Sequence, residues 1–413
     1  MSENKKIIVG IGKGIDGVVS AYLLKKQGFE VHLVSVNMNE VKHSLQQKDK
    51  LGHVEHHSYE LESNCAGVSL QRLKEISLSI NASYTYVDKL ENFKEEVIGT
   101  NAASSFSMIK KSPCYDCHQL LFSGLKEVAD KLSSSHISTG HYAKVQKNLT
   151  NGSTSILTGN DDINDQSHFL TVLPDEILKM LILPLGELQE KEILKISDKK
   201  NFDKFKSKSK VSTYCFNQGN FSDFVDHSFP NSLKKSGAII RQEDGFTLCQ
   251  HEGGHLFDLG EDVSSKLKLA PMGSTAVAYS GSTGKVIVTD KSKLVGLPIF
   301  IKLNYLKKFR DFSFKQNAFA RFETCHEESS VEGFFDVNIS LKVAKHLKLE
   351  FVEPPSFYPR PGMAVSIFEK SNEKNKLLLA AGEVCVDTVA GFGLDSASAN
   401  EKKDESESNS VNF

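Results

Sequence analysis

The N-terminal segment carries the pattern that most restricts the fold of this chain: an apolar stretch, a glycine-rich turn, a helical stretch and a second apolar stretch. Residues 7–12 have the composition of a strand, residues 18–27 have helical spacing that ends at Gly28, and residues 31–38 again resemble a strand. A parallel connection between two strands needs the length that a helix provides. The segment therefore predicts the start of an α/β domain built on a parallel sheet.

The alternation of helices and strands continues further along the chain. Residues 71–81 have helical spacing, residues 84–87 resemble a strand, and a 3.6-residue apolar stripe runs from Leu121 to Leu132 before a strand at Ile137. Alternating strands and helices place helices on both faces of a parallel sheet. We therefore expect a layered N-terminal domain.

Beyond residue 205 the helical spacing gives way to short strand-like runs separated by Gly-Ser turns, and the last residues contain almost no apolar side chains. A chain of 413 residues also exceeds the size of one ordinary core. We expect a nucleotide-binding and catalytic domain at 1–205, a small central β-rich domain at 206–282, a C-terminal β-barrel at 283–395 and a disordered tail at 396–413.

Composition predicts a cytoplasmic protein that does not enter a membrane. No apolar run approaches the roughly 20 residues that span a bilayer, and the N-terminus lacks the apolar stretch and cleavage site of a signal peptide. The seven cysteines are scattered and odd in number, which does not fit a secreted disulfide framework. The net charge of −2 neither requires nor excludes a nucleic-acid partner, because phosphate binding needs only a local basic face.

The glycine-rich turn at residues 10–17 is a candidate phosphate site. Between a strand and a helix, such a turn can direct backbone N–H groups and the helix dipole at an anion. It has neither the GxGxxG spacing of a dinucleotide-binding turn nor the Gly-Lys-Ser/Thr of a P-loop. A tight turn without any ligand is the alternative interpretation.

The sequence Pro113-Cys114-Tyr115-Asp116-Cys117-His118 contains a pair of cysteines that fits several kinds of site. A c-type haem attachment would need export from the cytoplasm, and a zinc site would need a second cysteine pair, which the chain lacks. A catalytic thiol is the third interpretation, because Cys117 precedes a predicted helix whose dipole would lower the thiol pKa. Buried cysteines that only cap a helix remain the structural alternative.

Several short motifs follow one another in an order that resembles the tRNA-specific 2-thiouridylase family. The resemblance extends from about residue 6 to residue 390, and no single motif carries it alone. The motifs are Gly10-Ile11-Gly12-Lys13-Gly14-Ile15-Asp16-Gly17, Pro113-Cys114-Tyr115-Asp116-Cys117, Thr139-Gly140-His141-Tyr142-Ala143, Asp165-Gln166-Ser167-His168-Phe169-Leu170, Leu183-Pro184-Leu185-Gly186, Cys215-Phe216 and Pro361-Gly362.

The resemblance implies a fold and a set of site residues. The fold would be an adenine-nucleotide α-hydrolase-like (PP-loop) domain followed by a central domain and a β-barrel. Cys117 matches the family's nucleophile, and Cys215 matches the cysteine that carries persulfide sulfur. The implied ATP contacts are Gly10, Ile11, Gly12, Lys13, Gly14, Ile15, Asp16, Gly17, Val36 and Gly140, and the implied tRNA contacts are His141, Asn164, Asp165, Gln166, Arg321 and Met363.

The implied reaction is the ATP-dependent 2-thiolation of the wobble uridine of tRNA. ATP and Mg²⁺ would serve as co-substrate and metal, while tRNA and a persulfide-bearing sulfur donor protein would be the partners. Adenylation would convert the uridine 2-oxygen, a poor leaving group, into part of AMP. Cys117 would then resolve the sulfur delivered by Cys215, which leaves a disulfide between these two cysteines.

The glycine-rich turn departs from the family pattern, which has serines where this chain has Gly12 and Gly17. A hydrogen bond from each serine to phosphate would contribute roughly 1.5–3 kcal/mol, so their loss weakens ATP binding. Asp16 is retained, and Lys13 either compensates as a point charge or fills the nucleotide site. The alternative function is a catalytically eroded paralogue that binds tRNA or another partner without adenylation.

Overall fold

The computed structural model describes most of the chain in ordered segments. Cys215, the central-domain residues 206–224 and the tail 396–413 lie outside the described residues. The described residues are 5–38, 41–48, 54–61, 67–109, 111–147, 152–205, 225, 229, 233–267, 273–294, 299–306, 316–323, 335–343, 346–353, 359–370 and 374–385.

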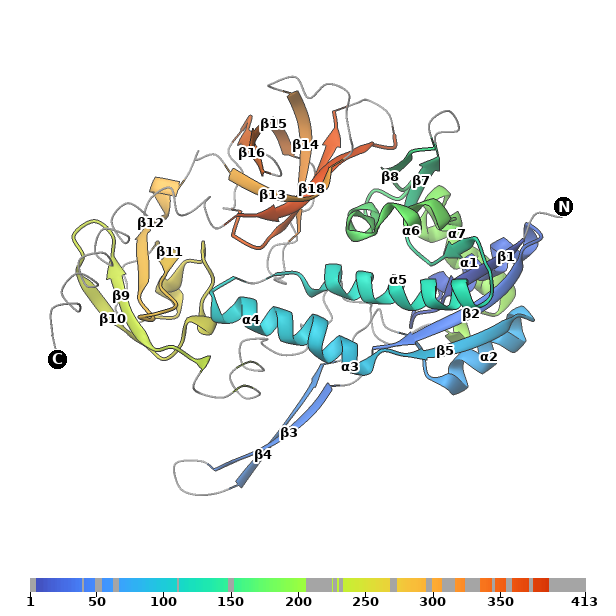
Figure 1. Ribbon diagram of the computed structural model, residues 1–413, viewed down its shortest axis with the longest axis horizontal. Helices are drawn as coiled ribbons and strands as arrows, with labels where there is room; N and C mark the ends of the chain where they lie inside the picture. Colours follow the sequence, from blue (N-terminus) through green and yellow to red (C-terminus); the bar gives the residue numbers. More distant parts are fainter. Residues whose placement is uncertain are drawn as a thin grey trace, which may run out of the picture.

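A four-stranded parallel sheet forms the centre of the N-terminal domain (Figure 1), as the alternating pattern predicts. Successive residues of a strand point to opposite faces, so Ile7 and Val9 pack on one face of the sheet, while Ile8 packs on the other. The strands, in spatial order, are β5 (Ser83–Asp88), β2 (Glu30–Asn37), β1 (Lys6–Gly10) and β6 (His136–Ser138).

Helices cover both faces of this sheet. The first face carries α1 (Asp16–Lys26), α2 (Leu70–Ile80) and α7 (Glu190–Lys200), and the second carries α5 (Pro113–Lys131) and α6 (Asp175–Met180). A continuous helical path precedes α5, made of α3 (Leu90–Asn92), a π-helical turn (Phe93–Gly99) and α4 (Thr100–Phe106). No helix among the described residues is both long enough and apolar enough to cross a bilayer.

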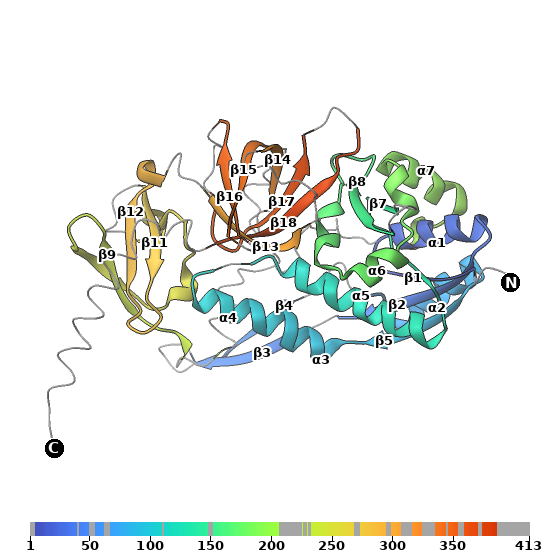
Figure 2. The ribbon, with the colours of Figure 1, turned by 45° about the horizontal axis from the view of Figure 1, so that its top comes forward.

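Two antiparallel hairpins extend from the N-terminal domain. One consists of β3 (Val41–Lys48) and β4 (Val54–Leu61) and projects away from the body of the molecule (Figure 1). The other consists of β7 (Ala143–Lys147) and β8 (Thr154–Thr158) and directly follows the strand-to-loop turn after β6. This second hairpin faces the C-terminal barrel (Figure 2).

The central domain contains a four-stranded sheet in the order β10-β9-β12-β11. The boundary expected after residue 282 is wrong for this sheet, because β12 pairs with both β9 and β11 and extends the sheet to Asp290. The strands are β9 (Gly237–Arg241), β10 (Thr247–His251), β11 (Ser274–Tyr279) and β12 (Val286–Asp290).

A closed six-stranded antiparallel barrel forms the C-terminal domain, in the order β13-β16-β15-β14-β17-β18. Alternate residues such as Ala318, Ala320 and Phe322 fill its interior. The predicted fold, with a helix-covered parallel sheet, a small central sheet and a barrel, is thereby confirmed. The barrel strands are β13 (Ile299–Leu306), β14 (Gln316–Glu323), β15 (Phe335–Val343), β16 (His346–Phe351), β17 (Ala364–Glu369) and β18 (Leu378–Val384).

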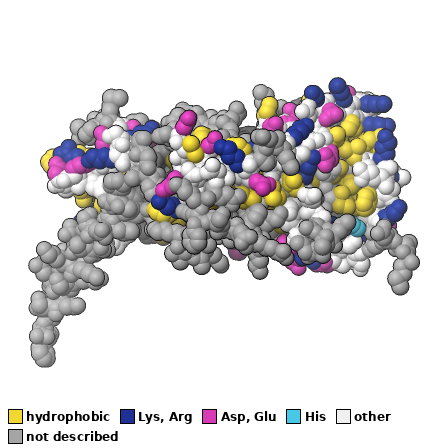
Figure 3. All heavy atoms as spheres, turned by 90° about the horizontal axis from the view of Figure 1, so that it is seen from above, with side chains coloured by type: hydrophobic (Ala, Val, Ile, Leu, Met, Phe, Trp, Pro, Cys, Tyr) yellow, Lys and Arg dark blue, Asp and Glu magenta, His cyan; other side chains and the backbone are white. Residues whose placement is uncertain are grey.

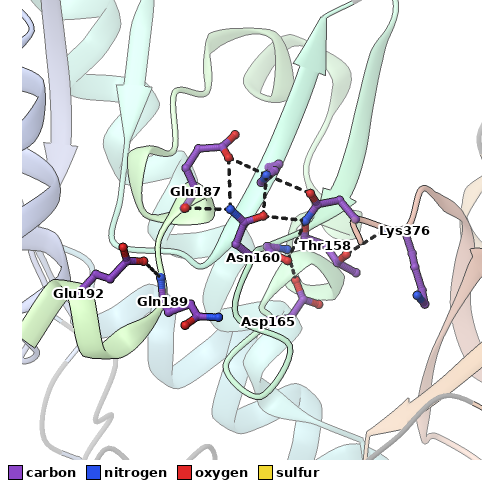
Figure 4. A network of polar contacts seen from close by, with 10 residues as sticks. Thr158, Asn160, Asp165, Glu187, Gln189, Glu192 and Lys376 are labelled. Carbon is purple, nitrogen blue, oxygen red and sulfur yellow. Dashed lines mark hydrogen bonds and ion pairs between the residues drawn. The ribbon is translucent and has the colours of Figure 1, made fainter. Parts of the chain in front are cut away.

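The barrel is attached to the N-terminal domain through backbone hydrogen bonds at the end of β8. The backbone N–H of Thr158 donates to the Lys376 carbonyl at 3.0 Å, and the Lys376 N–H donates to Thr158 Oγ1 at 2.8 Å (Figure 4). The Asn375 side chain donates to the carbonyls of Thr158 and Gly159, each at 2.9 Å. Residues 375–377 therefore lie along the edge of the β7–β8 hairpin, where Leu377 forms an isolated antiparallel bridge with Leu157.

Candidate functional site

The glycine-rich turn lies where β1 ends and α1 begins. The Ile11 N–H donates to the Val34 carbonyl at 2.8 Å, and Gly12 forms an isolated antiparallel bridge with Gly67. The side chains of Ile11 and Ile15 are buried in the core beneath α1 and α2. Apolar contacts of Ile11 and Ile15 thus anchor the turn in the core, while Gly12, Lys13 and Gly14 are half-exposed.

Asp16 at the start of α1 is tied to the turn that follows β6. Its Oδ1 accepts a hydrogen bond from the Tyr142 hydroxyl at 2.9 Å. Burial raises the pKa of this carboxyl above its ordinary value, although the bond from Tyr142 opposes the shift. Gly140 approaches so closely that a Cβ there would lie 2.6 Å from both Asp16 Cβ and Gly17 N. These two turns therefore form one packed unit.

The backbone of the glycine-rich turn at the start of α1 is compatible with a phosphate group. Ile15, the N-cap residue of α1, offers no side-chain acceptor to the N–H groups of the first turn, and a Cβ on Gly14 would meet only the Asp16 side chain and N–H. The position of Gly17 is closed, because a Cβ there would lie 2.8 Å from the Gly10 carbonyl oxygen. A serine hydroxyl at position 17 therefore does not fit this turn without a backbone shift.

Val36, the other predicted nucleotide contact, has a fully buried side chain that packs against α5 at Gly124. Its carbonyl accepts a hydrogen bond from the Gly67 N–H at 2.9 Å. A Cβ on Gly67 would lie 2.2 Å from Ser35 Oγ, so only glycine fits there. Gly67 therefore closes the edge of the site between the glycine-rich turn and the end of β2.

Cys114 and Cys117 both lie inside α5. The expectation that Cys117 precedes the helix is wrong, because Pro113 occupies the first helical position and Cys117 lies just past the first turn. The effect of a helix dipole falls off within the first turn, so the dipole alone gives Cys117 little activation. Both side chains are buried, and the cysteines among the described residues are thiols rather than disulfides.

Asp116 occupies a polar junction between the start of α5 and the barrel. Its pKa is raised to about 6, chiefly by burial, while the nearby Lys111 opposes this shift and Glu383 of β18 adds to it. Lys111 and Glu383 form an ion pair of 3.0 Å, and the Asn101 amide donates to Asp116 Oδ2 at 3.3 Å. A carboxyl that titrates close to neutral pH is suited to proton transfer.

Replacement of Asp116 by asparagine is expected to change the pH dependence of stability. The raised folded-state pKa means that the native state holds this proton more tightly than the unfolded chain, so stability falls as the pH rises from about 4 to 6. The variant should lose that fall and be more stable than the parent at pH 7.5, with the difference shrinking at pH 4. Urea unfolding across this range measures the effect.

Asp244→Asn is the control for this experiment. Its partner Arg241 holds the pKa of Asp244 at about 2, so its contribution to stability lies at higher pH and is lost only as the pH falls below about 4. An Asp116→Asn variant whose stability follows the same pH profile as the parent would contradict the assignment.

His141 is buried, with both ring nitrogens engaged. Its Nδ1 lies 2.6 Å from Thr139 Oγ1, and its Nε2 lies 2.8 Å from Nε2 of His118 on α5. Burial, together with His118 and His168, holds the pKa of His141 well below its ordinary value. This placement inside the domain favours a structural link between β6 and α5 over a contact with tRNA.

The loop after β8 carries the other predicted tRNA contacts of the N-terminal domain. Asn164 and Gln166 are half-exposed, and Gln166 Oε1 accepts a hydrogen bond from the Tyr142 N–H at 3.1 Å. Asp165 points inward, where its carboxylate accepts a hydrogen bond from the Gly159 N–H at 2.8 Å (Figure 4) and another from the Ser167 hydroxyl at 2.8 Å. The loop is thus fixed by its buried acid and offers its two amides at the surface.

Arg321 of β14 in the barrel forms an ion pair with Asp165 at 3.1 Å. Burial raises the pKa of Asp165, and Arg321 opposes that shift. The two residues, both predicted as tRNA contacts, are therefore brought together across the junction between domains. Met363 lies in the barrel core, and its burial argues against a contact between its side chain and tRNA.

Arg321→Met is expected to destabilise the protein by about 3 kcal/mol at neutral pH, because it leaves a buried carboxylate without its cation. Urea unfolding measures the loss. The double variant Asp165→Asn/Arg321→Met removes both charges and should be more stable than Arg321→Met alone. Equal stability of the parent and Arg321→Met would show that the pair contributes nothing.

Two contacts of the site were not predicted from the sequence. Tyr142 lies within the Thr-Gly-His-Tyr-Ala motif, but its bond to Asp16 spans 126 residues of sequence. His118 directly follows Cys117, where its only sequence signal was the resemblance to a haem-attachment string. No three carboxylate, imidazole or thiol groups of the described segments converge closely enough to hold a metal ion.

Comparison with known proteins identifies the family of this chain. The family model described as tRNA methyl transferase HUP domain matches residues 5–219, which is just over half of the chain. The chain is 27% identical over 292 residues to tRNA-specific 2-thiouridylase MnmA 2 of Fusobacterium nucleatum, covering 70% of this chain and 77% of that protein.

Two further relatives give similar values. The match to the probable mitochondrial tRNA-specific 2-thiouridylase 1 of Caenorhabditis elegans is 28% identical over 309 residues, covering 70% of this chain and 75% of that protein. The match to tRNA-specific 2-thiouridylase MnmA of Francisella philomiragia is 27% identical over 260 residues, covering 63% and 67%.

Proposed function

Because this chain belongs to the tRNA methyl transferase HUP domain family, that of the tRNA-specific 2-thiouridylases, we propose that it catalyses the ATP-dependent 2-thiolation of the wobble uridine of tRNA. The observation that carries the proposal is a continuous set of contacts between the glycine-rich turn and the cysteine helix. Asp16 contacts the turn after β6 through Tyr142 and Gly140, and His141 of that turn contacts His118, the neighbour of Cys117.

ATP supplies the activation that the uridine 2-oxygen needs before it can leave. The backbone N–H groups at the start of α1 and the Lys13 ammonium group would hold its phosphates, with Mg²⁺ accompanying ATP as a counter-ion. Gly67 and Val36 would border the same site through their backbone. Asp16, held by Tyr142, fixes the start of α1 and so the direction of these donors.

The sulfur transfer is proposed to use Cys215 and Cys117 in turn. The terminal sulfur of a Cys215 persulfide, loaded by a sulfur donor protein, bonds to C2 of the uridine, and AMP leaves with the former 2-oxygen. The Cys117 thiolate then attacks the Cys215 sulfur and breaks its bond to the sulfur on the base. The products are 2-thiouridine and a Cys117–Cys215 disulfide, which a thiol reductant reopens.

We propose that tRNA lies against the loop after β8 and the adjacent α7. Asn164 and Gln166 offer amides there, and the exposed Lys191 and Lys195 lie on α7, whose first N–H donates to Asp161 of the loop. Lys and Arg side chains gather along this end of the molecule (Figure 3). Such lysines contact phosphates without reading sequence. Arg321 contributes by holding Asp165, and thereby the loop, in place.

A second candidate is a tRNA-binding protein that has lost adenylation. The specific observation in its favour is Gly17, where the turn leaves no room for a serine hydroxyl. A turn that binds phosphate only through its backbone and Lys13 would bind ATP more weakly, since each lost hydrogen bond to a charged group costs roughly 1.5–3 kcal/mol.

The two functions are separated by incubating the purified full chain with ATP, Mg²⁺ and an unmodified tRNA transcript, with and without a persulfide donor protein. Pyrophosphate release that depends on tRNA, followed by 2-thiouridine in nucleoside mass spectra when the donor is added, supports thiolation. Binding of tRNA without pyrophosphate release supports the second candidate. Neither binding nor release would contradict both.

A further inference from the structure

A chain of three hydrogen bonds runs through the interior between β6 and α5. Thr139 Oγ1 lies 2.6 Å from His141 Nδ1, and the Nε2 atoms of His141 and His118 lie 2.8 Å apart. At the far end, His118 Nδ1 lies 2.5 Å from the carbonyl oxygen of Cys114. All four residues are buried.

The chemistry of its ends fixes the direction of this chain. A carbonyl oxygen only accepts, so the hydrogen on His118 must be on Nδ1, and Nε2 of the neutral ring is an acceptor. His141 must then donate from Nε2, which leaves its Nδ1 to accept from the Thr139 hydroxyl. Each ring is thereby restricted to one tautomer, and the two differ: Nδ1–H in His118 and Nε2–H in His141.

The surroundings keep His141 neutral and hold both rings in place. The Phe169 ring stacks on His118 with centroids 4.4 Å apart and an interplanar angle of 7°, and the Phe122 ring lies 5.8 Å from His141. An extra proton between the two Nε2 atoms would set two donors against each other, and His141 resists protonation because of its burial. The pair therefore behaves as a fixed connector.

Each end of the connector reaches one half of the candidate site. Thr139 directly precedes Gly140, whose backbone is packed against Asp16 and Gly17 at the start of α1. Cys114 lies one position into the first turn of α5, three residues before Cys117. A shift at either end must therefore pass through the two imidazole rings or break a buried hydrogen bond, which costs about 1–3 kcal/mol.

We propose that His118 and His141 are positioning residues that set the Cys117 segment of α5 at a fixed distance from the glycine-rich turn. This inference rests on the proposed thiolation. Neither ring touches the reacting atoms. The chain of three hydrogen bonds through His118 and His141, called the relay below, fixes the position of the Cys117 segment relative to the glycine-rich turn. Both outer hydrogen bonds, to Thr139 and to the Cys114 carbonyl, are needed for that.

Two substitutions of His118 test the relay by keeping one bond each. His118→Asn keeps an amide donor near the Nδ1 position for the Cys114 carbonyl, whereas His118→Gln can keep an acceptor near the Nε2 position for His141. Both variants should lower kcat for thiolation by about 10- to 100-fold, as expected of misplaced reacting groups, with the KM for tRNA changed less than about twofold. Full kcat in either variant overturns the proposal.

His251→Asn is the matched control. His251 is also a buried histidine bonded to a backbone carbonyl, that of Gly284 at 2.7 Å, but it lies in the central sheet. Its replacement should lower thermal stability and leave kcat unchanged. An equal loss of kcat in His251→Asn would show that the His118 effects report general destabilisation, which also overturns the proposal.

A measurement without turnover separates this inference from the proposed function. Nitrogen-15 spectra of the full chain labelled at histidine should show the Nδ1–H tautomer for His118 and the Nε2–H tautomer for His141, assigned with single variants. Thr139→Val should shift the His118 resonances although the Thr139 hydroxyl is bonded to His141 and not to His118. If the two rings show the opposite tautomers, or if the His118 resonances do not move, the positioning role of the histidines is overturned even when the enzyme is active. If the expected spectra are seen in a chain that does not thiolate tRNA, only the proposed function is refuted.

Discussion

Cys117→Ser is expected to reduce 2-thiolation of tRNA by about 10³-fold or more, the size of effect seen when a nucleophile is removed from other enzymes. A serine hydroxyl is not appreciably ionised at neutral pH and cannot open a sulfur–sulfur bond, so the sulfur on the base would stay attached to Cys215. The helix should survive the change, because serine is nearly the same size as cysteine. Nucleoside mass spectrometry of tRNA measures the product.

Cys249→Ser is the control for this variant. Cys249 is a half-buried thiol of β10 in the central sheet, and burial raises its pKa above the ordinary value. A thiol of that kind is inert, so thiolation should match the parent. If Cys117→Ser forms as much 2-thiouridine as Cys249→Ser in the same assay, Cys117 does not take part in the mechanism.

Gly140→Ala should disable the site with a single methyl group. The added carbon would lie 2.6 Å from Asp16 Cβ and from the Gly17 N–H nitrogen, much closer than any van der Waals contact allows. The Gly17 nitrogen belongs to the backbone and Asp16 Cβ is bonded directly to it, so neither atom can rotate away, and the turn after β6 and the start of α1 must separate. We expect a stability loss of about 1–3 kcal/mol from overpacking and a loss in kcat of about 100-fold from the displaced groups.

Gly281→Ala gives the comparison for Gly140→Ala. A Cβ on Gly281, which lies outside the candidate site, would have no atom within 4 Å. This variant should have nearly the melting temperature and the kcat of the parent. If Gly140→Ala matched it in melting temperature and rate, the two turns would not be the packed unit described above.

The sequence predicted those parts of the fold that depend on local pattern. The strand, glycine turn and helix of residues 6–26 follow from spacing alone, and the alternation of Ala318, Ala320 and Phe322 marks a barrel strand. The end of the central sheet was misplaced because β12 belongs to it through pairing with β9, and pairing between distant segments leaves no local signal.

The sequence predicted which residues belong to the candidate site, but it did not predict which of them contact one another. Motif order indicated Cys117 and Asp16, but the position of Cys117 within α5 depends on Pro113 starting the helix four residues earlier. The pairing of Arg321 with Asp165 joins residues 156 apart, and no spacing rule relates them. His141 was predicted as a tRNA contact and His118 was not singled out, and nothing in the sequence relates the two, because their pairing is visible only as a contact between the rings.

The contact between residues 375–377 and β8 has a consequence for how the chain unfolds. Because residues beside the barrel hydrogen-bond to the end of a hairpin of the other domain, neither can melt without breaking these bonds and exposing the buried Thr158 to water. Barrel and hairpin should therefore behave as one cooperative unit in hydrogen exchange, with matched protection at Thr158 and the strands of the barrel. An N-terminal fragment that stops before the barrel would present an open sheet edge, a known starting point for aggregation.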